Sequence, residues 1–443
     1  MSRKDLVDKF LNFEEDNNLV FDTTWQYMRM ELFRYIEDDL FNTLCIPIYI
    51  RQPIKSLVLP HISDISKREI IILNTKNRFV TINKETFCPA TGGVKEYIKL
   101  GQNELSFDFS NGVVYVNDKS LRGIEIDASL YKLYNEKCYS EIIEKCCSYF
   151  CLHNIDKFKE RAFSLCKYVY SLRKHKFNVI ELLKASGAKY MFVNGAYNPV
   201  FRLFIEVANE MDIISCEMQH GYIHQCHVAY NTLKRDSQRA VTMPRYLAVY
   251  TDQDKKSARY FQDNSHIIPI GNFCFEKAKK INNSADSYDF LFVSATNSEA
   301  VKKYAISFAK HFPTLKILYR FHPEERVDDI YLSQLNSNGI KFEFAKERSV
   351  YLSINECQNV VTYNSTVTFE ALYFKKNVFV ITDDLIKIDE SIARYVTEIT
   401  DPAQLIEHID CGTAVGIEYS MLTGDYESSI NSLLNAMRGE HKC

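Results

Sequence analysis

The chain has 443 residues, of which 46% are hydrophobic and 25% charged, a balance typical of soluble globular proteins with two or three domains. The formal net charge of −3 gives no overall attraction to phosphate backbones, so we do not expect nucleic acid as a partner. The 13 cysteines include no Cys-x-x-Cys pair, which argues against a zinc motif and for reduced thiols. No apolar run reaches the roughly 18 residues of a membrane-spanning helix and no secretory signal follows Met1, so we expect a cytoplasmic protein.

The first 120 residues change from helical to strand-like character. Residues 1 to 45 are predicted to be helical because their apolar side chains recur every three or four positions. These side chains are Trp25, Met28, Leu32, Ile36 and Leu40. Thr23 or Thr24 is expected to cap this helix. Residues 46 to 120 are predicted to form a β-rich insertion, with a hairpin turn at Asn111-Gly112.

The following segment is predicted to be helical over residues 125 to 186, which contain neither Pro nor Gly, and then to form a βαβ unit. A buried strand at 189 to 193 precedes Asn198-Pro199, a helix start with Pro at the first helical position. The strand Ile213 to Met218 follows. The further elements predicted here are a strand at Tyr246 to Tyr250 and a helix from about Gln253.

The second half of the chain alternates regularly between strands and helices, which predicts a parallel, doubly wound sheet. The polar, unpatterned residues 276 to 287 are predicted to be the interdomain linker. The chain then consists of an N-terminal domain of residues 1 to 275, which includes the β-rich insertion, and a C-terminal domain of residues 288 to 412. Residues 413 to 443 are predicted to be helical, with a return to the first domain as one option.

A histidine-rich loop follows the strand Ile213 to Met218. Ligands of open α/β sheets bind at the carboxyl ends of strands, so the segment Gln219-His220-Gly221 is expected to deliver His220 to a binding site. A neutral imidazole near pH 7 suits removal of a proton from a hydroxyl, and we predict His220 as the catalytic base and Glu217 as its rival. Strict alternation along the strand would place these two side chains on opposite faces unless the turn rotates one of them.

This loop and a neighbouring strand end supply the predicted acceptor-binding residues. They are Asn194, Gly195, Gly221, Tyr222, His224 and His227. Tyr222 is expected either to stack on a sugar or to pack within the protein. His220, His224 and His227 also have the spacing of metal ligands on a helix, but Gly221 interrupts that spacing, so we predict no metal site.

Polar side chains also follow three strands of the second half. Hydroxyls and free backbone N–H groups at a helix N-terminus form a ready anion site, to which a strand-end histidine adds a donor. A carboxylate one turn into the helix could accept hydrogen bonds from ribose hydroxyls. The predicted donor-binding residues are Ser294, His322, Pro323, Asn364, Ser365, Thr366 and Glu370. The phosphate cradle that they would form needs no metal.

The sequence here resembles a known family. Phe321-His322-Pro323 and the segment from Asn364 to Ala371 resemble the His-Pro and Ser-Ser/Thr motifs of bacterial GT-B glycosyltransferases. These enzymes, polysialyltransferases and Kdo transferases, build capsules and lipopolysaccharides from CMP-activated ulosonic acids. Their catalytic base lies in an acidic-acidic-Gly motif, where this chain has Gln219-His220-Gly221. Teichoic-acid glycerophosphotransferases, which use CDP-polyols, are similar too and have His-Gly at that point, but Asp in place of Glu370.

The resemblance covers roughly residues 190 to 385 and implies an α/β protein of GT-B fold, with two Rossmann-like domains that face each other across a cleft. It implies transfer of a sugar, preferably a CMP-activated ulosonic acid, to an oligosaccharide or glycolipid acceptor, without a further cofactor and with peripheral contact to the cytoplasmic face of the inner membrane as an option. A CDP-polyol phosphotransferase or another nucleotide-sugar transferase is the alternative. An epimerase of GT-B shape and a non-catalytic nucleotide- or glycan-binding protein on the same fold also remain open.

Overall fold

The computed structural model describes most of the chain in two compact units. The described residues are 1–41, 67–75, 79–82, 85–97, 104–110, 113–116, 119–120, 137–236, 240–279, 287–295, 298–322, 325, 327–345, 347–363, 365–382, 388, 392–410 and 425–440. Unit 1 comprises Met1–Phe79, Cys88–Gly271 and Gly424–Cys443, and unit 2 comprises Val80–Phe87 and Asn272–Thr423. Each unit has its own sheet and its own core.

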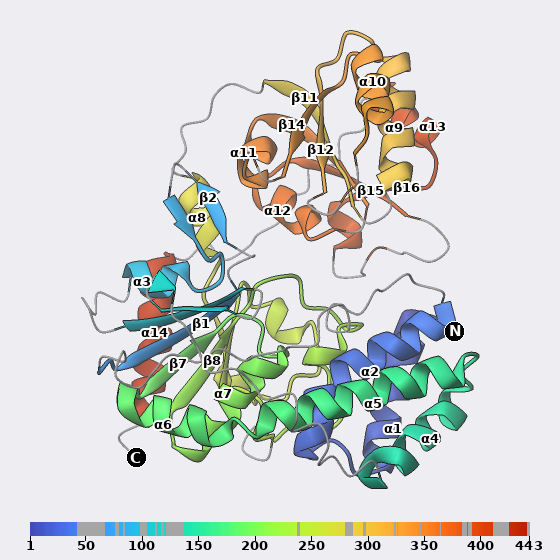
Figure 1. Ribbon diagram of the computed structural model, residues 1–443. Helices are drawn as coiled ribbons and strands as arrows, with labels where there is room; N and C mark the ends of the chain where they lie inside the picture. Colours follow the sequence, from blue (N-terminus) through green and yellow to red (C-terminus); the bar gives the residue numbers. More distant parts are fainter. Residues whose placement is uncertain are drawn as a thin grey trace. The chain divides into compact units, whose positions relative to one another are not determined.

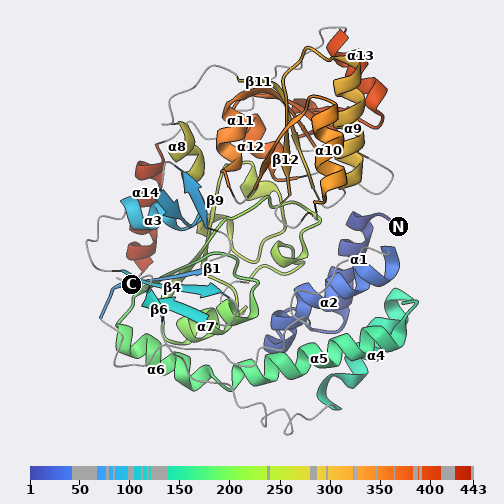
Figure 2. The same ribbon diagram turned by 45° about the horizontal axis from the view of Figure 1, so that its top comes forward.

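One group of helices in unit 1 comes from the chain before β7 (Tyr190–Val193). Its members are α1 (Arg3–Asp16), α2 (Thr23–Phe41), α4 (Lys137–Phe150), α5 (Ile155–Arg173) and α6 (Lys176–Ser186). In Figure 2, α4, α5 and α6 follow one another along one side of unit 1, and α2 lies beside α5. The predicted apolar face of α2 is confirmed, since Trp25 and Ile36 are fully buried. The predicted cap is wrong: the Asp22 carboxylate accepts the N–H of Trp25 at 2.7 Å, because it lies just before the first turn, where free N–H groups need an acceptor.

The sheet of unit 1 has the strand order β10-β9-β8-β7-β1-β4-β5-β6. The strands are β1 (Ile70–Thr75), β4 (Glu104–Ser110), β5 (Val113–Val116), β6 (Lys119–Ser120), β7 (Tyr190–Val193), β8 (Ile214–Met218), β9 (Tyr246–Val249) and β10 (Ile267–Pro269). Neighbours from β10 to β4 run parallel, and β4, β5 and β6 pair antiparallel. Residues 46 to 120 therefore differ from the predicted insertion: β1 is a central strand, buried along Ile70 to Leu73 as strands of parallel sheets are. The expected turn Asn111-Gly112 lies outside the described residues.

Helices α7 (Pro199–Glu210), α3 (Gly92–Tyr97) and α14 (Tyr426–Glu440) also belong to unit 1. The Asn198 side chain accepts the N–H of Val200 at 2.9 Å, so the predicted helix start is confirmed. The described part of the C-terminal segment, α14, packs on α3 (Figure 1). The helix expected from about Gln253 is only the 3-10 turn η5 (Asp254–Lys256), since η6 (Asn264–His266) and β10 follow closely.

Unit 2 is a doubly wound sheet with the order β13-β12-β11-β14-β15-β16, and all neighbours run parallel. Its strands are β11 (Tyr288–Val293), β12 (Ile317–Phe321), β13 (Lys341–Phe344), β14 (Cys357–Thr362), β15 (Asn377–Ile381) and β16 (Thr397–Ile399). Its main helices are α9 (Ser298–His311), α10 (Asp329–Ser337), α11 (Val350–Asn355), α12 (Val367–Tyr373) and α13 (Pro402–Asp410). Figure 1 shows α9, α10 and α13 on one face of the sheet and α11 and α12 on the other, and each face has its own apolar core. The predicted α/β class with two Rossmann-like domains is confirmed.

The start of unit 2 differs from the predicted linker at 276 to 287. Helix α8 (Phe273–Lys279) packs in unit 2, where the ring of Phe275 lies 4.0 Å from that of Tyr373. The hairpin of β2 (Val80–Ile82) and β3 (Glu85–Phe87) packs there as well, with Phe87 5.1 Å from Phe273. The polar residues after the start of α8 led to the prediction of a linker, although the aromatic side chains Phe273 and Phe275 favour packing in a core. Residues 280–286 lie outside the described residues.

Candidate active site

The turn after β8 is fixed by Gln219, which is buried. Its N–H donates to Ala248 O at 2.8 Å, and its side-chain oxygen accepts the N–H of Tyr250 at 2.6 Å. Its amide nitrogen donates to Gly221 O at 2.9 Å. These three bonds take the chain out of the strand at Gln219, so strand alternation no longer sets the direction of the next side chain, His220.

His220 and Glu217 consequently lie on the same side. Nδ1 of His220 is 4.0 Å from Oε1 of Glu217, and Nε2 is 3.0 Å from the Tyr197 hydroxyl. Strict alternation would have placed these two side chains on opposite faces of the sheet. The turn at Gln219 instead rotates His220 toward Glu217. The predicted Gly195 lies against the imidazole: a Cβ there would be 3.5 Å from its Cε1, and φ is +84°, a left-handed conformation that favours glycine.

Glu217 is a buried acceptor of hydrogen bonds. Its Oε1 accepts the N–H of Ala196 at 3.0 Å and the hydroxyl of Tyr230 at 2.7 Å, and the residue is 4% exposed. Both donors stabilise the ionised carboxylate. Glu217 also interacts through its charge with Arg202 on α7, which is buried too. Burial lowers the pKa of Arg202 to about 10; the Arg29 charge lowers this pKa further, and the Glu217 charge raises it. A carboxylate held in this way, 4.0 Å from Nδ1 of His220, can stabilise the protonated imidazole through its charge.

The predicted acceptor-binding residues of the loop form a chain of rings that reaches His220. Tyr222 stacks on His224 at 5.2 Å, and His224 lies 6.1 Å from His227. Tyr197 joins this chain to the base, with its ring 5.7 Å from His227 and 5.5 Å from His220. Burial, with the nearby charges of His224, Arg3 and Arg34, lowers the pKa of His227 to about 3, so this imidazole is neutral at pH 7.

The backbone of the histidine loop is held by hydrogen bonds of its own. Within the ranges that the structure describes, no three or more side chains of His, Cys, Asp or Glu converge as metal ligands would. The loop is instead tied down by Asn231, whose side-chain nitrogen donates to His227 O at 2.9 Å and to His224 O at 3.2 Å.

Two residues on the N-terminal helices support the loop from behind, and the sequence analysis missed them. The Arg29 guanidinium donates to Val228 O at 2.7 Å and to Asn231 O at 2.9 Å. Its charge is balanced by Glu14 at 2.7 Å, and both side chains are 2% exposed. Tyr197 belongs to the strand end, Asn194 to Tyr197, that was expected to line the binding site, but its side chain was given no role of its own.

Asn194 directly follows β7, the strand beside β8. Val193 pairs in register with Glu217, so Asn194 begins the next turn at the same sheet edge. Its amide nitrogen contacts Cys88 Sγ at 3.1 Å, while its oxygen is buried and has no hydrogen-bond partner among the described residues. The role of Asn194 in acceptor binding stays a prediction.

In unit 2, three neighbouring strands end at one edge of the sheet. Val293 is in register with Arg320 of β12 and with Thr362 of β14, so the chain segments that begin with Ser294, His322 and Tyr363 leave the sheet side by side. Ser365 Oγ accepts the N–H of Val367 at 3.3 Å, and Thr366 is exposed. The predicted Pro323 and Asn364 lie outside the described residues.

Glu370 has a carboxyl group with one oxygen unused. Oε1 accepts the Tyr351 hydroxyl at 3.4 Å, whereas Oε2 is buried and has no hydrogen-bond partner among the residues described. Burial raises the pKa of Glu370 to about 7, against the Tyr351 hydrogen bond and the Arg320 charge. The role of Glu370 as an acceptor for ribose hydroxyls stays a prediction.

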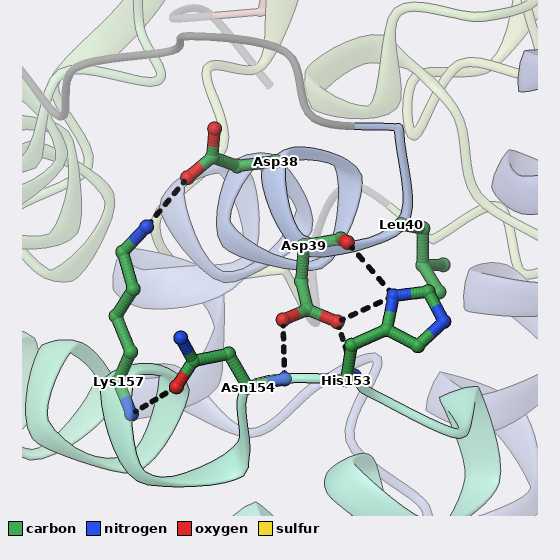
Figure 3. Close-up of a pocket in the computed structure, with 6 residues that line it drawn as sticks. All are labelled: Asp38, Asp39, Leu40, His153, Asn154 and Lys157. Atoms are coloured by element: carbon green, nitrogen blue, oxygen red, sulfur yellow. Dashed lines mark hydrogen bonds and ion pairs between the residues drawn. The ribbon is translucent and has the colours of Figure 1, made fainter.

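A cavity of about 420 Å³ elsewhere in unit 1 has a structural explanation (Figure 3). It lies between the end of α2 and the start of α5. The Asp39 carboxylate accepts the N–H groups of His153 at 2.5 Å and Asn154 at 2.8 Å, and Asp38 pairs with Lys157 at 3.7 Å. These side chains satisfy one another and tie the start of α5 to α2, at the helix N-terminus that carboxylates favour.

Known structures resemble the fold. No family model matches the sequence, and no curated protein matches it. The UDP-GlcNAc 2-epimerase from Neisseria meningitidis, bound to UDP-GlcNAc, is 13% identical with a TM-score of 0.50, over 83% of this chain and 99% of that one. Another UDP-N-acetylglucosamine 2-epimerase is 12% identical with a TM-score of 0.51, over 85% and 97% of the two chains. A variant of the wall teichoic acid polymerase TagF is 12% identical with a TM-score of 0.43, over 94% and 99%.

The fold is GT-B. At these identities the likeness concerns the fold of the two Rossmann-like units alone, while the chemistry depends on the residues of each site. No helix in the described part of the chain is long and apolar enough to cross a membrane.

Proposed function

We propose that the protein is a glycosyltransferase in which unit 2 binds a nucleotide sugar and His220 of unit 1 deprotonates the acceptor hydroxyl. The observation that carries this proposal is the pairing of His220 with the buried Glu217 at 4.0 Å, at the carboxyl end of a central strand. An imidazole with a carboxylate behind it takes a proton from a hydroxyl as the attack proceeds, and the carboxylate stabilises the imidazolium that forms. A protein that only binds nucleotides has no need of this pair.

The donor half of the proposal rests on the strand ends of unit 2. His322, Ser365 and Thr366 hold the leaving phosphate and offset its developing charge, with Asn364, Pro323 and Ser294 beside them. The unused Oε2 of Glu370 accepts from the ribose. These groups replace a metal ion, so transfer is expected to persist in EDTA. Loss of transfer in EDTA, restored by one divalent ion, would contradict this part.

The donor is proposed to be a CMP-activated ulosonic acid, because the His-Pro and Ser-Thr segments resemble those of CMP-dependent enzymes. A CDP-polyol is the runner-up, favoured by the His-Gly pair at His220. The acceptor is proposed to be an oligosaccharide or glycolipid, bound by Asn194, Gly195, Gly221, Tyr222, His224 and His227. The proposed location is the cytoplasm, with peripheral contact to the cytoplasmic face of the inner membrane as an option.

The test is a two-step panel on the purified chain. Thermal shift with CMP, CDP, UDP and GDP comes first, since a ligand at one hundred times its Kd stabilises the folded state by about 2.7 kcal/mol. We expect the cytidine nucleotides to raise Tm. Consumption of a CMP-ulosonic acid, CDP-glycerol and UDP-GlcNAc is then followed with the matching acceptors. A response to UDP alone, with interconversion of UDP-GlcNAc and no transfer, would instead make the protein an epimerase.

A further inference from the structure

The ring nitrogen of His220 that would take the proton, Nε2, already lies within hydrogen-bonding distance of the Tyr197 hydroxyl. The Tyr197 hydroxyl lies 3.0 Å from Nε2, the nitrogen that faces away from Glu217. The carboxylate beside Nδ1 favours the tautomer with its proton on Nδ1, which leaves Nε2 as the acceptor of the Tyr197 O–H. An acceptor hydroxyl that approaches this nitrogen therefore meets Tyr197 on the way.

Tyr197 is held in place from several sides. The N–H of Asn198 donates to Gly195 O at 3.0 Å and closes the turn that carries Tyr197, and the N–H of Ala196, the residue before Tyr197, donates to Glu217 at 3.0 Å. Its ring packs edge-on against Tyr230 at 6.2 Å and beside His227 at 5.7 Å. The same carboxylate thus lies 4.0 Å from Nδ1 of the base and accepts a hydrogen bond from the turn that presents the tyrosine.

We propose that Tyr197 is a catalytic residue that relays the proton from the acceptor to His220; this rests on the transferase function proposed above. A phenol hydroxyl both donates and accepts, which a relay requires. The acceptor O–H proton passes to the Tyr197 oxygen while the Tyr197 proton passes to Nε2. The acceptor oxygen bonds to the anomeric carbon, and the bond from that carbon to the phosphate oxygen breaks. The nucleotide leaves with the electron pair, and His220 is left as an imidazolium beside Glu217.

The alternative is that Tyr197 only positions the imidazole through its ring. Tyr197→Phe separates the two, because it keeps the ring contacts with His227 and Tyr230 and removes only the hydroxyl. Tyr246→Phe is the matched control: it also removes a hydroxyl from unit 1, one that donates to Glu440 at 2.8 Å on the side of α14.

The contact itself is tested without substrate, by NMR of the full chain with labelled histidine. Nε2 of His220 is expected to show a hydrogen-bonded signal that moves in Tyr197→Phe and stays in Tyr246→Phe. An unchanged His220 signal in Tyr197→Phe would show that the hydroxyl does not bind the base, and would overturn the relay.

The relay is tested by single-turnover transfer. Tyr197→Phe is expected to lose at least about 100-fold in kcat at unchanged donor affinity, and wild type to show a solvent isotope dependence with two moving protons. Tyr197→Phe within about threefold of wild type, or a one-proton dependence, would leave only a positioning role. A wild-type chain that transfers nothing would reject the proposed function and the relay together, whereas an active wild type with an active Tyr197→Phe rejects the relay alone.

Discussion

At His220, three neighbours determine what the imidazole can do. Glu217 lies 4.0 Å from Nδ1, Tyr197 lies 3.0 Å from Nε2, and Gly195, whose φ of +84° favours glycine, packs against the ring. Two opposite charges 4 Å apart attract by about 4 kcal/mol at an effective dielectric constant of about 20. That attraction is large enough for Glu217 to favour the imidazolium formed during proton transfer. His220 is therefore suited to act as a base, because the charge of Glu217 stabilises its protonated form.

Glu370 should make nucleotide affinity depend on pH. Its carboxyl has a pKa of about 7, raised by burial, and only the ionised form accepts hydrogen bonds from both ribose hydroxyls. As pH falls below 7 the group binds a proton, so we expect affinity for CMP to weaken by up to tenfold per pH unit. Calorimetric titration between pH 5.5 and 8.5 is the measurement. Glu370→Gln should bind weakly at every pH, and a wild-type affinity that parallels this variant across the range would contradict the assignment.

At the scale of elements, the N-terminal helices act as the support of the histidine loop. Arg29 of α2 holds the carbonyl groups of Val228 and Asn231, on both sides of the 3-10 turn η4 (Val228–Tyr230), and Glu14 of α1 balances its charge. A buried ion pair of this kind is strongly destabilised when one partner is removed, because the other charge is left without compensation. The helices that precede the sheet therefore matter for the geometry of the site.

Arg29→Met should lower the free energy of unfolding of unit 1 by about 3 to 5 kcal/mol, since Glu14 then keeps a buried charge without its partner. Urea denaturation measures this. The double variant with Glu14→Gln should recover part of the loss. Arg259→Met is the control, because its pair with Asp8 is 41% and 44% exposed and is worth under about 1 kcal/mol. Equal losses in Arg29→Met and Arg259→Met would refute the role of the buried pair.

The strand ends could be predicted from the sequence, and their surroundings could not. An apolar run that stops in a polar residue marks the end of a buried strand, which located both His220 and His322. The rotation of His220 depends on Gln219, whose bonds reach the neighbouring strand β9, and periodicity does not report such bonds. The support by Arg29 joins residues 199 positions apart, beyond the reach of any local pattern.

At the scale of the whole molecule, two units with separate cores divide the proposed work. The chain crosses between them more than once: Val80–Phe87 belongs to unit 2 and Gly424–Cys443 to unit 1. This crossing explains why a single polar linker was too simple a prediction. Because each core is complete, a ligand of one unit should stabilise that unit first.

Hydrogen exchange with and without CMP should locate the donor half-site. We expect slower exchange in peptides that cover β12 with His322 and β14 with the start of α12, since ligand contacts at strand ends lower the rate of local opening. His322→Ala should remove this protection, whereas Lys341→Ala, an exposed position in the same unit, should keep it. Protection confined to unit 1 would refute the assignment of the nucleotide to unit 2.

The central claim is that His220 is the base, and the rate of transfer at saturating donor tests it most directly. His220→Ala should bind CMP like wild type and lose 10²- to 10⁴-fold in rate, because a proton acceptor is gone while the donor contacts remain. His220→Asn should be equally slow, since an amide cannot take the proton. If His220→Ala keeps more than about a tenth of the wild-type rate while Glu217→Gln loses nearly all of it, the base is Glu217 and His220 is structural.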